Sequence, residues 1–240
     1  MELDVILVFS WSPIVTGTPG LVPEESTAPE SATANGYTQS KWVSERILEV
    51  AAEQTTLRPV IVRVGQVSGG VNGSWNPLEW IPGIVQSAAL TRSLPSFGKV
   101  ISLLPLQTCA QALVQIARAT RPAMHLHLVN PTPSQWDDVF GCIAEKLGVP
   151  LVSYSEWLSK LKEESMAVKN VEEHSVLRLV GLYEGMSHGV GSEAGGLPSC
   201  NTEVTRSVCT VLNGEGLREI EAEEIQRWLD YWESVGVLKF

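Results

Sequence analysis

Hydrophobic residues fall into runs that predict alternating strands and helices. Two continuous apolar runs, at 4–9 and 58–64, are typical of strands buried on both faces of a parallel sheet. A third segment, 124–129, alternates between apolar and polar residues and predicts another strand of that sheet. Helical spacing predicts a helix over 38–53. The apolar stripe expected to face the core comprises Trp42, Val43, Ile47, Val50 and Ala51.

Shorter elements are predicted between the second strand and residue 150. Helical spacing favours a helix over 83–91, and a short strand is expected at 101–105. Thr108 is an N-cap candidate for a helix that ends near residue 118. Pro133 suits the first position of a further helix, which should end near residue 147 with Gly148 as its C-cap.

Beyond Pro150 the composition changes to predominantly helical patterns. Residues 155–186 are expected to be largely helical, 187–199 to form a Gly-rich loop, and 221–235 to form an amphipathic helix. The apolar stripe of that last helix, expected to pack in the core, comprises Ile225, Trp228, Leu229 and Trp232. We therefore expect an α/β protein with a Rossmann-like core over 1–150 and a smaller helical substrate or cap subdomain over 151–240.

Composition narrows the classes of function. The net charge of −10 over 240 residues argues against nucleic acid as a partner, because phosphate contacts need clustered Lys and Arg. No apolar run is long enough to cross a bilayer and the start lacks a basic signal-peptide region, so we expect a soluble, cytoplasmic protein. The four cysteines lack zinc-site spacing, which favours reduced thiols and no metal.

Tyr37 and Lys41 carry the strongest chemical signal in the chain. They are one helical turn apart and so project from one face of the helix. The Lys ammonium can lower the pKa of the phenol, which can then donate a proton to a nascent alkoxide. Ser12, after the first strand, can hydrogen-bond the same oxygen, with Ser10 as the competing serine. This pattern indicates a nicotinamide-dependent oxidoreductase with Ser12, Tyr37 and Lys41 as catalytic residues.

Two further segments carry candidate sites. The loop 68–82 follows the second strand, and its Trp75, Asn76 and Trp80 are expected either to line a substrate mouth or to pack as a connecting loop. His125 and His127 share one face of the third strand. With no Cys or carboxylate partner nearby in sequence, we expect them to be solvent-facing or hydrogen-bonded, and no metal site.

The chain resembles the extended short-chain dehydrogenase/reductase superfamily at Ser12 to Gly17 and at Tyr37 and Lys41, which match its YxxxK motif. A more specific likeness, to thioester reductase domains of fungal adenylate-forming reductases and nonribosomal peptide synthetases, rests on residues 63–75, 104–117 and 228–232. This resemblance implies cofactor contacts from Tyr37, Lys41, Gly65, Gln66 and Val67. It also implies NADPH as the cofactor and an acyl-phosphopantetheine carrier domain as the partner.

One departure from the family concerns the Gly-rich turn that binds the cofactor pyrophosphate. No such turn precedes Ser12, and the glycine clusters at 69–73 and 189–196 are not followed at once by a helix. We therefore expect an incomplete sheet that lacks the first strands and the Gly-rich turn, as part of a longer protein.

The resemblance implies NADPH-dependent reduction of a carrier-bound acyl thioester to an aldehyde or on to an alcohol. Two alternatives remain. The first is a sugar-nucleotide epimerase or dehydratase, or a ketoreductase, with the same triad. The second is an inactive remnant or binding module that takes no cofactor.

Overall fold

A computed structural model describes residues 5–10, 21–32, 36–167, 175–189, 191–213, 217 and 219–238. Three parallel strands form its largest sheet, in the order β1 (Val5–Ser10), β2 (Arg58–Val64) and β7 (His125–Leu128). The register pairs Leu7 with Val60 and Val62 with Leu126. The three predicted strands thus share one parallel sheet, as expected.

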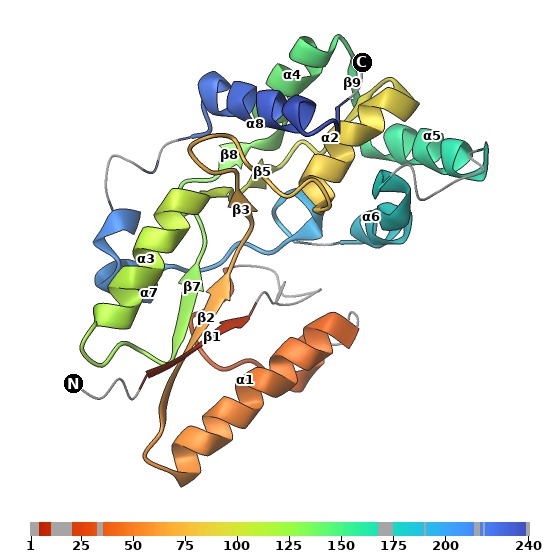
Figure 1. Cartoon of the computed structure of the whole chain (residues 1–240). Helices are drawn as coiled ribbons and strands as arrows, with labels where there is room; N and C mark the ends of the chain where they lie inside the picture. The colour runs from red at the N-terminus through yellow and green to blue at the C-terminus, as the bar shows by residue number, and fades with distance from the viewer. Residues whose placement is uncertain are drawn as a thin grey trace.

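Helices cover the two faces of this sheet differently. Helix α1 (Gly36–Gln54) crosses from β1 to β2 on one side, and α3 (Leu106–Arg118) lies on the other (Figure 1). Helix α7 (Glu203–Val208) and the 3₁₀ turn η5 (Thr210–Leu212) also pack beside β7 and α3. The face toward α3 is apolar, with Val60, Val62, Leu126 and Leu128 in one buried cluster with Ile116 and Leu212.

The larger hydrophobic cluster lies beyond the carboxyl ends of β2 and β7, at the top of Figure 1. Its helices are α2 (Trp80–Thr91), α4 (Trp136–Leu147), α5 (Tyr154–Ala167), α6 (Val180–Met186) and α8 (Ala222–Ser234). Two 3₁₀ turns, η3 (Ser175–Leu179) and η4 (Ala194–Gly196), join them, and a third, η1 (Pro29–Ala32), precedes α1. This cluster contains residues from both sides of position 150. The domain boundary expected there stays a prediction.

Short strand pairs join distant parts of the chain. They are β3 (Val67–Ser68) with β6 (Leu104–Pro105), β4 (Leu94–Ser96) with β9 (Leu151–Ser153), and β5 (Val100–Ile101) with β8 (Ser134–Gln135). The single strand expected at 101–105 is therefore two strands. Each pairs with a different partner, which local sequence does not reveal.

Several helix boundaries differ from those expected. Helix α3 begins at Leu106, with Pro105 rather than Thr108 at its N-cap. Helix α4 begins at Trp136, because Ser134 and Gln135 pair with β5 before the helix starts. The C-cap at Gly148 is confirmed, with a left-handed backbone (φ 66°). Helix α8 is also confirmed, and Glu221 and Glu224 form a reciprocal capping box at its start.

The face of α1 that packs on the sheet was predicted wrongly. Val43 and Ile47 are 48% and 63% exposed, whereas Glu45 and Glu49 are buried. The reason lies on the strands, where Arg63, His125 and His127 occupy the face toward α1. Because buried cationic and polar groups require partners, the helix turns its carboxylates inward.

Candidate functional site

Tyr37 and Lys41 lie in the first two turns of α1. Since α1 joins the parallel strands β1 and β2, it begins at the carboxyl side of the sheet and runs back toward the amino side (Figure 1). That side is where doubly wound sheets bind ligands. Tyr37 is 49% exposed, and Lys41 Nζ lies over its ring, 5.3 Å from the ring centroid.

The serine of the expected triad lies outside the described residues, because Ser12 belongs to the segment 11–20. The competing Ser10 is the last residue of β1, and its Cα pairs with that of Arg63. The structure therefore brings Tyr37 and Lys41 together and leaves the choice of serine as a prediction.

The expected lowering of the Tyr37 pKa is not found. Partial burial instead raises the pKa of Tyr37 above its ordinary value, because burial disfavours the charged phenolate. In this arrangement Tyr37 is a protonated phenol near neutral pH. A protonated phenol is the form that a proton donor requires.

Gly65, Gln66 and Val67 follow β2 directly. The Gly65 N–H donates to the carbonyl of Leu128 at 2.9 Å, so the ends of β2 and β7 stay paired past the strands. A Cβ at Gly65 would lie 2.5 Å from Val129 Cγ1, which explains why glycine stands there. Cofactor contact by these three residues stays a prediction.

The side chain of Gln66 organises the loop that follows. Its Oε1 accepts a hydrogen bond from Trp80 Nε1 at 2.7 Å, and its Nε2 donates to Glu79 Oε2 at 3.1 Å and to the Val67 carbonyl at 2.9 Å. The same Glu79 oxygen accepts from Trp75 Nε1 at 3.0 Å. Gln66 and Glu79 thus satisfy both indole N–H groups inside the loop.

Trp75 and Trp80 are packed in the larger hydrophobic cluster, at 4% and 6% exposure. The Trp75 ring centroid lies 5.0 Å from that of Trp228, and the Trp80 centroid lies 5.9 Å from that of Trp136. Asn76 is exposed, and its Oδ1 accepts from the Leu78 N–H at 3.1 Å. This packing supports the alternative of a connecting loop, and substrate contact by these residues stays a prediction.

The glycines at 69–73 permit close packing of α8. A Cβ at Gly69 would lie 2.5 Å from Trp228 Nε1, and one at Gly73 would lie 1.9 Å from the Arg227 carbonyl oxygen. Protein atoms occupy the space next to these two glycines, so the glycines cannot hold a pyrophosphate. Gly69 and Gly73 therefore do not suit the phosphates of a dinucleotide, and cofactor contact by Tyr37 and Lys41 stays a prediction.

A polar cleft of about 410 Å³ lies just past the carboxyl end of β7. Its lining comes from four parts of the chain: Leu21, Ser102, Asn130 with two prolines after β7, and residues of the run from Glu193 to Arg206. Glu193 holds the run in place by accepting from the Ser102 N–H at 2.9 Å and from its hydroxyl at 2.8 Å. Burial raises the pKa of Glu193. Sequence analysis missed this cleft, although Asn130, a polar residue just past a strand, was a usable signal.

The sequence pattern also did not predict that the face of the sheet toward α1 is polar. Arg63 on β2 pairs with Glu45 of α1, with Nη2 to Oε2 at 2.8 Å, and His125 Nε2 lies 2.9 Å from Glu49 Oε1. Of the two alternatives expected for the histidines, solvent-facing or hydrogen-bonded, the structure shows the second, since both are buried and His127 contacts Arg63 and the Asn201 carbonyl. No group of three or more His, Cys, Asp or Glu side chains suited to a metal occurs in the described ranges.

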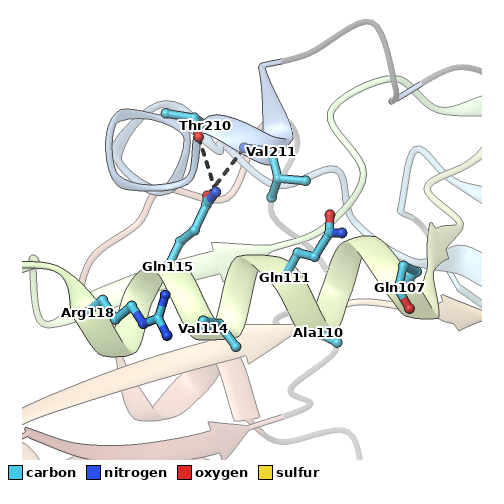
Figure 2. Close-up of a pocket in the computed structure, with 8 residues that line it drawn as sticks. All are labelled: Gln107, Ala110, Gln111, Val114, Gln115, Arg118, Thr210 and Val211. Atoms are coloured by element: carbon cyan, nitrogen blue, oxygen red, sulfur yellow. Dashed lines mark hydrogen bonds between the residues drawn. The ribbon is translucent and has the colours of Figure 1, made fainter.

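A second hollow, of about 620 Å³, lies on the outer face of α3 against η5. Figure 2 shows Gln115 of α3 bonded to Thr210 and to the backbone of Val211, with Gln111, Val114 and Arg118 along the same helix. None of the expected site residues lines this hollow. Because α1 lies on the other side of the sheet, this hollow is separate from Tyr37 and Lys41 (Figure 1).

Comparison with known proteins gives consistent results. An NAD-binding family model described as "Male sterility protein" matches residues 14–113. The adenylate-forming reductase Nps10 of Heterobasidion annosum is 35% identical over 217 residues, which cover 85% of this chain and 20% of Nps10.

Solved structures share the fold. The terminal R domain from the myxalamid PKS-NRPS biosynthetic pathway superposes with a TM-score of 0.77 at 23% identity, covering 98% of this chain and 59% of that one. The UDP-glucuronic acid 4-epimerase of Bacillus cereus has a TM-score of 0.61 at 11% identity, covering 98% of this chain and 63% of that one. The chain therefore has a Rossmann-like α/β fold, which it shares with reductase and epimerase structures.

Residues 14–113 thus match the NAD-binding family described as "Male sterility protein", and the chain is similar over most of its length to part of the adenylate-forming reductase Nps10. The resemblance found in its sequence is thereby confirmed. The chain spans about a fifth of the length of Nps10. No helix in the described part of the chain is long and apolar enough to cross a membrane.

Proposed function

We propose that this chain carries the proton relay of an acyl-thioester reductase, which uses NADPH to reduce a carrier-bound acyl thioester to an aldehyde. The observation that carries the proposal is the pair Tyr37 and Lys41 at the start of α1, on the carboxyl side of the parallel sheet. The family match adds nucleotide binding, and the similarity to adenylate-forming reductases favours an acyl thioester as substrate.

When bound, NADPH would supply a hydride for the thioester carbonyl carbon, and the chain's own residues would handle the proton. The Tyr37 hydroxyl donates its proton to the carbonyl oxygen, which gives a hemithioacetal. Loss of the thiol, with transfer of the hydroxyl proton to sulfur, releases the aldehyde. Lys41 would hold the nicotinamide ribose, and its ammonium stabilises the Tyr37 phenolate that forms on proton transfer, which solvent then reprotonates. Ser12 orients the carbonyl oxygen by a hydrogen bond.

The proposed partner is a phosphopantetheine carrier domain, in the same polypeptide or in another. The cleft past β7 is the candidate place for the amide groups of a pantetheine arm, because its lining includes the polar residues Ser199, Asn201 and Arg206. A carrier domain as neighbour is also consistent with one solved structure that shares the fold, a thiolation-reductase di-domain from an archaeal non-ribosomal peptide synthetase.

One observation favours a rival, a module that does not bind a cofactor by itself. Gly69 and Gly73 pack against Trp228 and Arg227, so these two glycines offer no phosphate cradle. Calorimetry separates the two: the chain alone should bind NADPH weakly, and the full polypeptide that carries it should bind tightly. Low-micromolar affinity of the isolated chain would remove this argument for the rival.

The direct test is NADPH oxidation by the full polypeptide with an acyl-pantetheine thioester, with aldehyde and free thiol measured in parallel. The proposal expects one aldehyde and one thiol for each NADPH consumed. Oxidation of NADPH with a sugar nucleotide or a simple ketone, and none with the thioester, would favour the alternative short-chain reductase activities.

A further inference from the structure

Three buried polar side chains from three elements form a row across the sheet. Arg63 of β2 binds Glu45 of α1 through Nη2 at 2.8 Å and through Nε at 3.2 Å to each carboxylate oxygen. On its other side, Arg63 Nη1 lies 3.1 Å from Nε2 of His127 on β7. All three side chains belong to residues that are at most 3% exposed.

The hydrogen bonds of His127 fix its protonation state. A carbonyl can only accept, so the Asn201 oxygen 2.9 Å from Nδ1 requires a proton on Nδ1. A guanidinium can only donate, so Nε2 must offer its lone pair to Arg63. His127 is therefore neutral, and each of its ring nitrogens is used.

The far end of the row is tied to the wall of the polar cleft. Asn201, whose carbonyl accepts from His127, lines that cleft. The backbone N–H of His127 donates to Thr205 Oγ1 at 2.8 Å and to Glu24 Oε1 at 3.1 Å. Glu24 in turn accepts from the backbone N–H groups of Val204 and Thr205. One end of the row thus holds the helix with Tyr37 and Lys41, and the other end holds the cleft wall.

Geometry distinguishes this row from ordinary core packing. A bidentate Arg–carboxylate pair is planar and directional, so it permits one rotation of α1 about its axis, whereas apolar contacts tolerate several. Glu45 is one turn beyond Lys41 on the same helix. Fixing Glu45 therefore fixes the direction in which Lys41 and Tyr37 project.

We propose that Glu45, Arg63 and His127 are positioning residues, which set Tyr37 and Lys41 in register with the cleft past β7. This inference rests on the proposed function, because it assumes that the helix and the cleft act on one substrate. Buried ion pairs contribute little net stability compared with apolar replacements, which leaves specificity of placement as the main effect of this one.

The test uses the full polypeptide and the double variant Glu45→Met/Arg63→Met, which removes both charges and leaves none unpaired. Turnover with acyl-pantetheine thioester should fall at least about tenfold, since small misplacements of reacting groups are costly. The melting temperature should fall only modestly, because the double variant leaves one buried polar atom, His127 Nε2, without its donor. The matched control is Glu156→Met/Lys160→Met, which removes an exposed ion pair from α5 and should leave turnover unchanged.

Separate measurement of kcat and KM distinguishes positioning from stability. In the folded double variant kcat should fall while KM for the thioester changes little, because the reacting groups are misplaced while the cleft residues are unchanged. Wild-type kcat in this variant would overturn the positioning role while leaving the proposed function intact.

If the wild-type protein does not reduce the thioester, the proposed function fails, and hydrogen exchange of α1 amides decides the positioning role. Faster exchange in the double variant than in the control would support fixation of α1 by the row. Equal exchange in the two variants would overturn it.

Discussion

The two faces of the central sheet are held to their helices by opposite means. Leu126 and Leu128 of β7 point to the α3 side and join an apolar cluster, whereas His125 and His127 of the same strand point to α1 and make polar contacts. Residues that are adjacent in sequence thus belong to an apolar interface and to an ionic one.

The apolar interface mainly contributes to the stability of the fold, whereas the ionic interface mainly sets the orientation of α1. Each fully buried aliphatic side chain on the α3 side contributes about 1.5–3 kcal/mol, with little dependence on precise orientation. The ion pair on the α1 side contributes little net free energy but demands one geometry. The helix that carries Tyr37 and Lys41 is held by the interface that specifies geometry.

The largest stability effect is expected from breaking the ionic face on one side only. Arg63→Met leaves Glu45 buried without its partner, so unfolding free energy should fall by about 3–5 kcal/mol. Urea denaturation followed by circular dichroism measures this loss. A loss below about 1 kcal/mol would show that Glu45 finds water or another partner, and that the interface is less dry than the structure indicates.

A cavity on the apolar face should cost somewhat less. Leu126→Ala removes a fully buried side chain next to His127, and unfolding free energy should fall by about 2–5 kcal/mol. Below the denaturation midpoint, turnover of the folded protein should stay within about twofold of wild type, because this face sets no geometry for α1. A strong loss of turnover without unfolding would contradict the division between the two faces.

Lower pH should weaken the ionic face selectively. Burial and the neighbouring Arg63 lower the pKa of His127 to about 4, and the pKa of His125 is lowered by the same causes. Because the native His127 stays neutral where the unfolded one protonates, stability is complete above about pH 6.5 and declines as pH falls toward 4. At about 1.4 kcal/mol per pKa unit, the loss from His127 is on the order of 3 kcal/mol.

The control for this pH effect compares the buried His127 with the exposed His188. The groups that face His127 are Arg63, Glu24, His125 and the Asn201 carbonyl. His127→Gln should flatten much of the decline between pH 6.5 and 4, whereas the same change at the exposed His188 should not. An unchanged slope in His127→Gln would show that other groups, such as the His125–Glu49 pair, carry the pH dependence.

The smallest effect is expected on the solvent side of α1. Arg46→Met removes contacts to Glu49 at 3.0 Å and Glu53 at 3.4 Å, but the Arg46 side chain is 46% exposed. Exposed pairs contribute about 0–1 kcal/mol, so the melting temperature should hardly move. A larger shift would show that charge on α1 matters beyond the buried row.

Sequence patterns predicted the elements better than their partners. The three parallel strands and α8 were predicted because continuous apolar runs and 3.6-residue spacing report burial directly. The buried face of α1 was predicted wrongly. Apolar spacing within the helix cannot show that Arg63 and two histidines lie on the strands that face it. Likewise, β5 and β6 pair with strands far along the chain, and pairing of that kind leaves no local signal.

The candidate site was predictable to a similar degree. The spacing of Tyr37 and Lys41 was sufficient to locate them on one helix at the carboxyl side of the sheet. For the cleft past β7 the sequence offers one signal, Asn130 just after the strand, because the rest of the lining comes from Leu21, Ser102 and the run from Glu193 to Arg206. Only tertiary structure brings these segments together.

The most direct test of the central claim, that α1 carries a proton donor, is turnover of Tyr37→Phe in the full polypeptide. The change removes the hydroxyl and keeps the ring, so folding should be preserved and turnover should fall by about 10²- to 10⁴-fold. Ser12→Ala and Ser10→Ala, measured alongside, identify the serine by the larger loss. Turnover of Tyr37→Phe close to that of the wild-type protein would contradict the account.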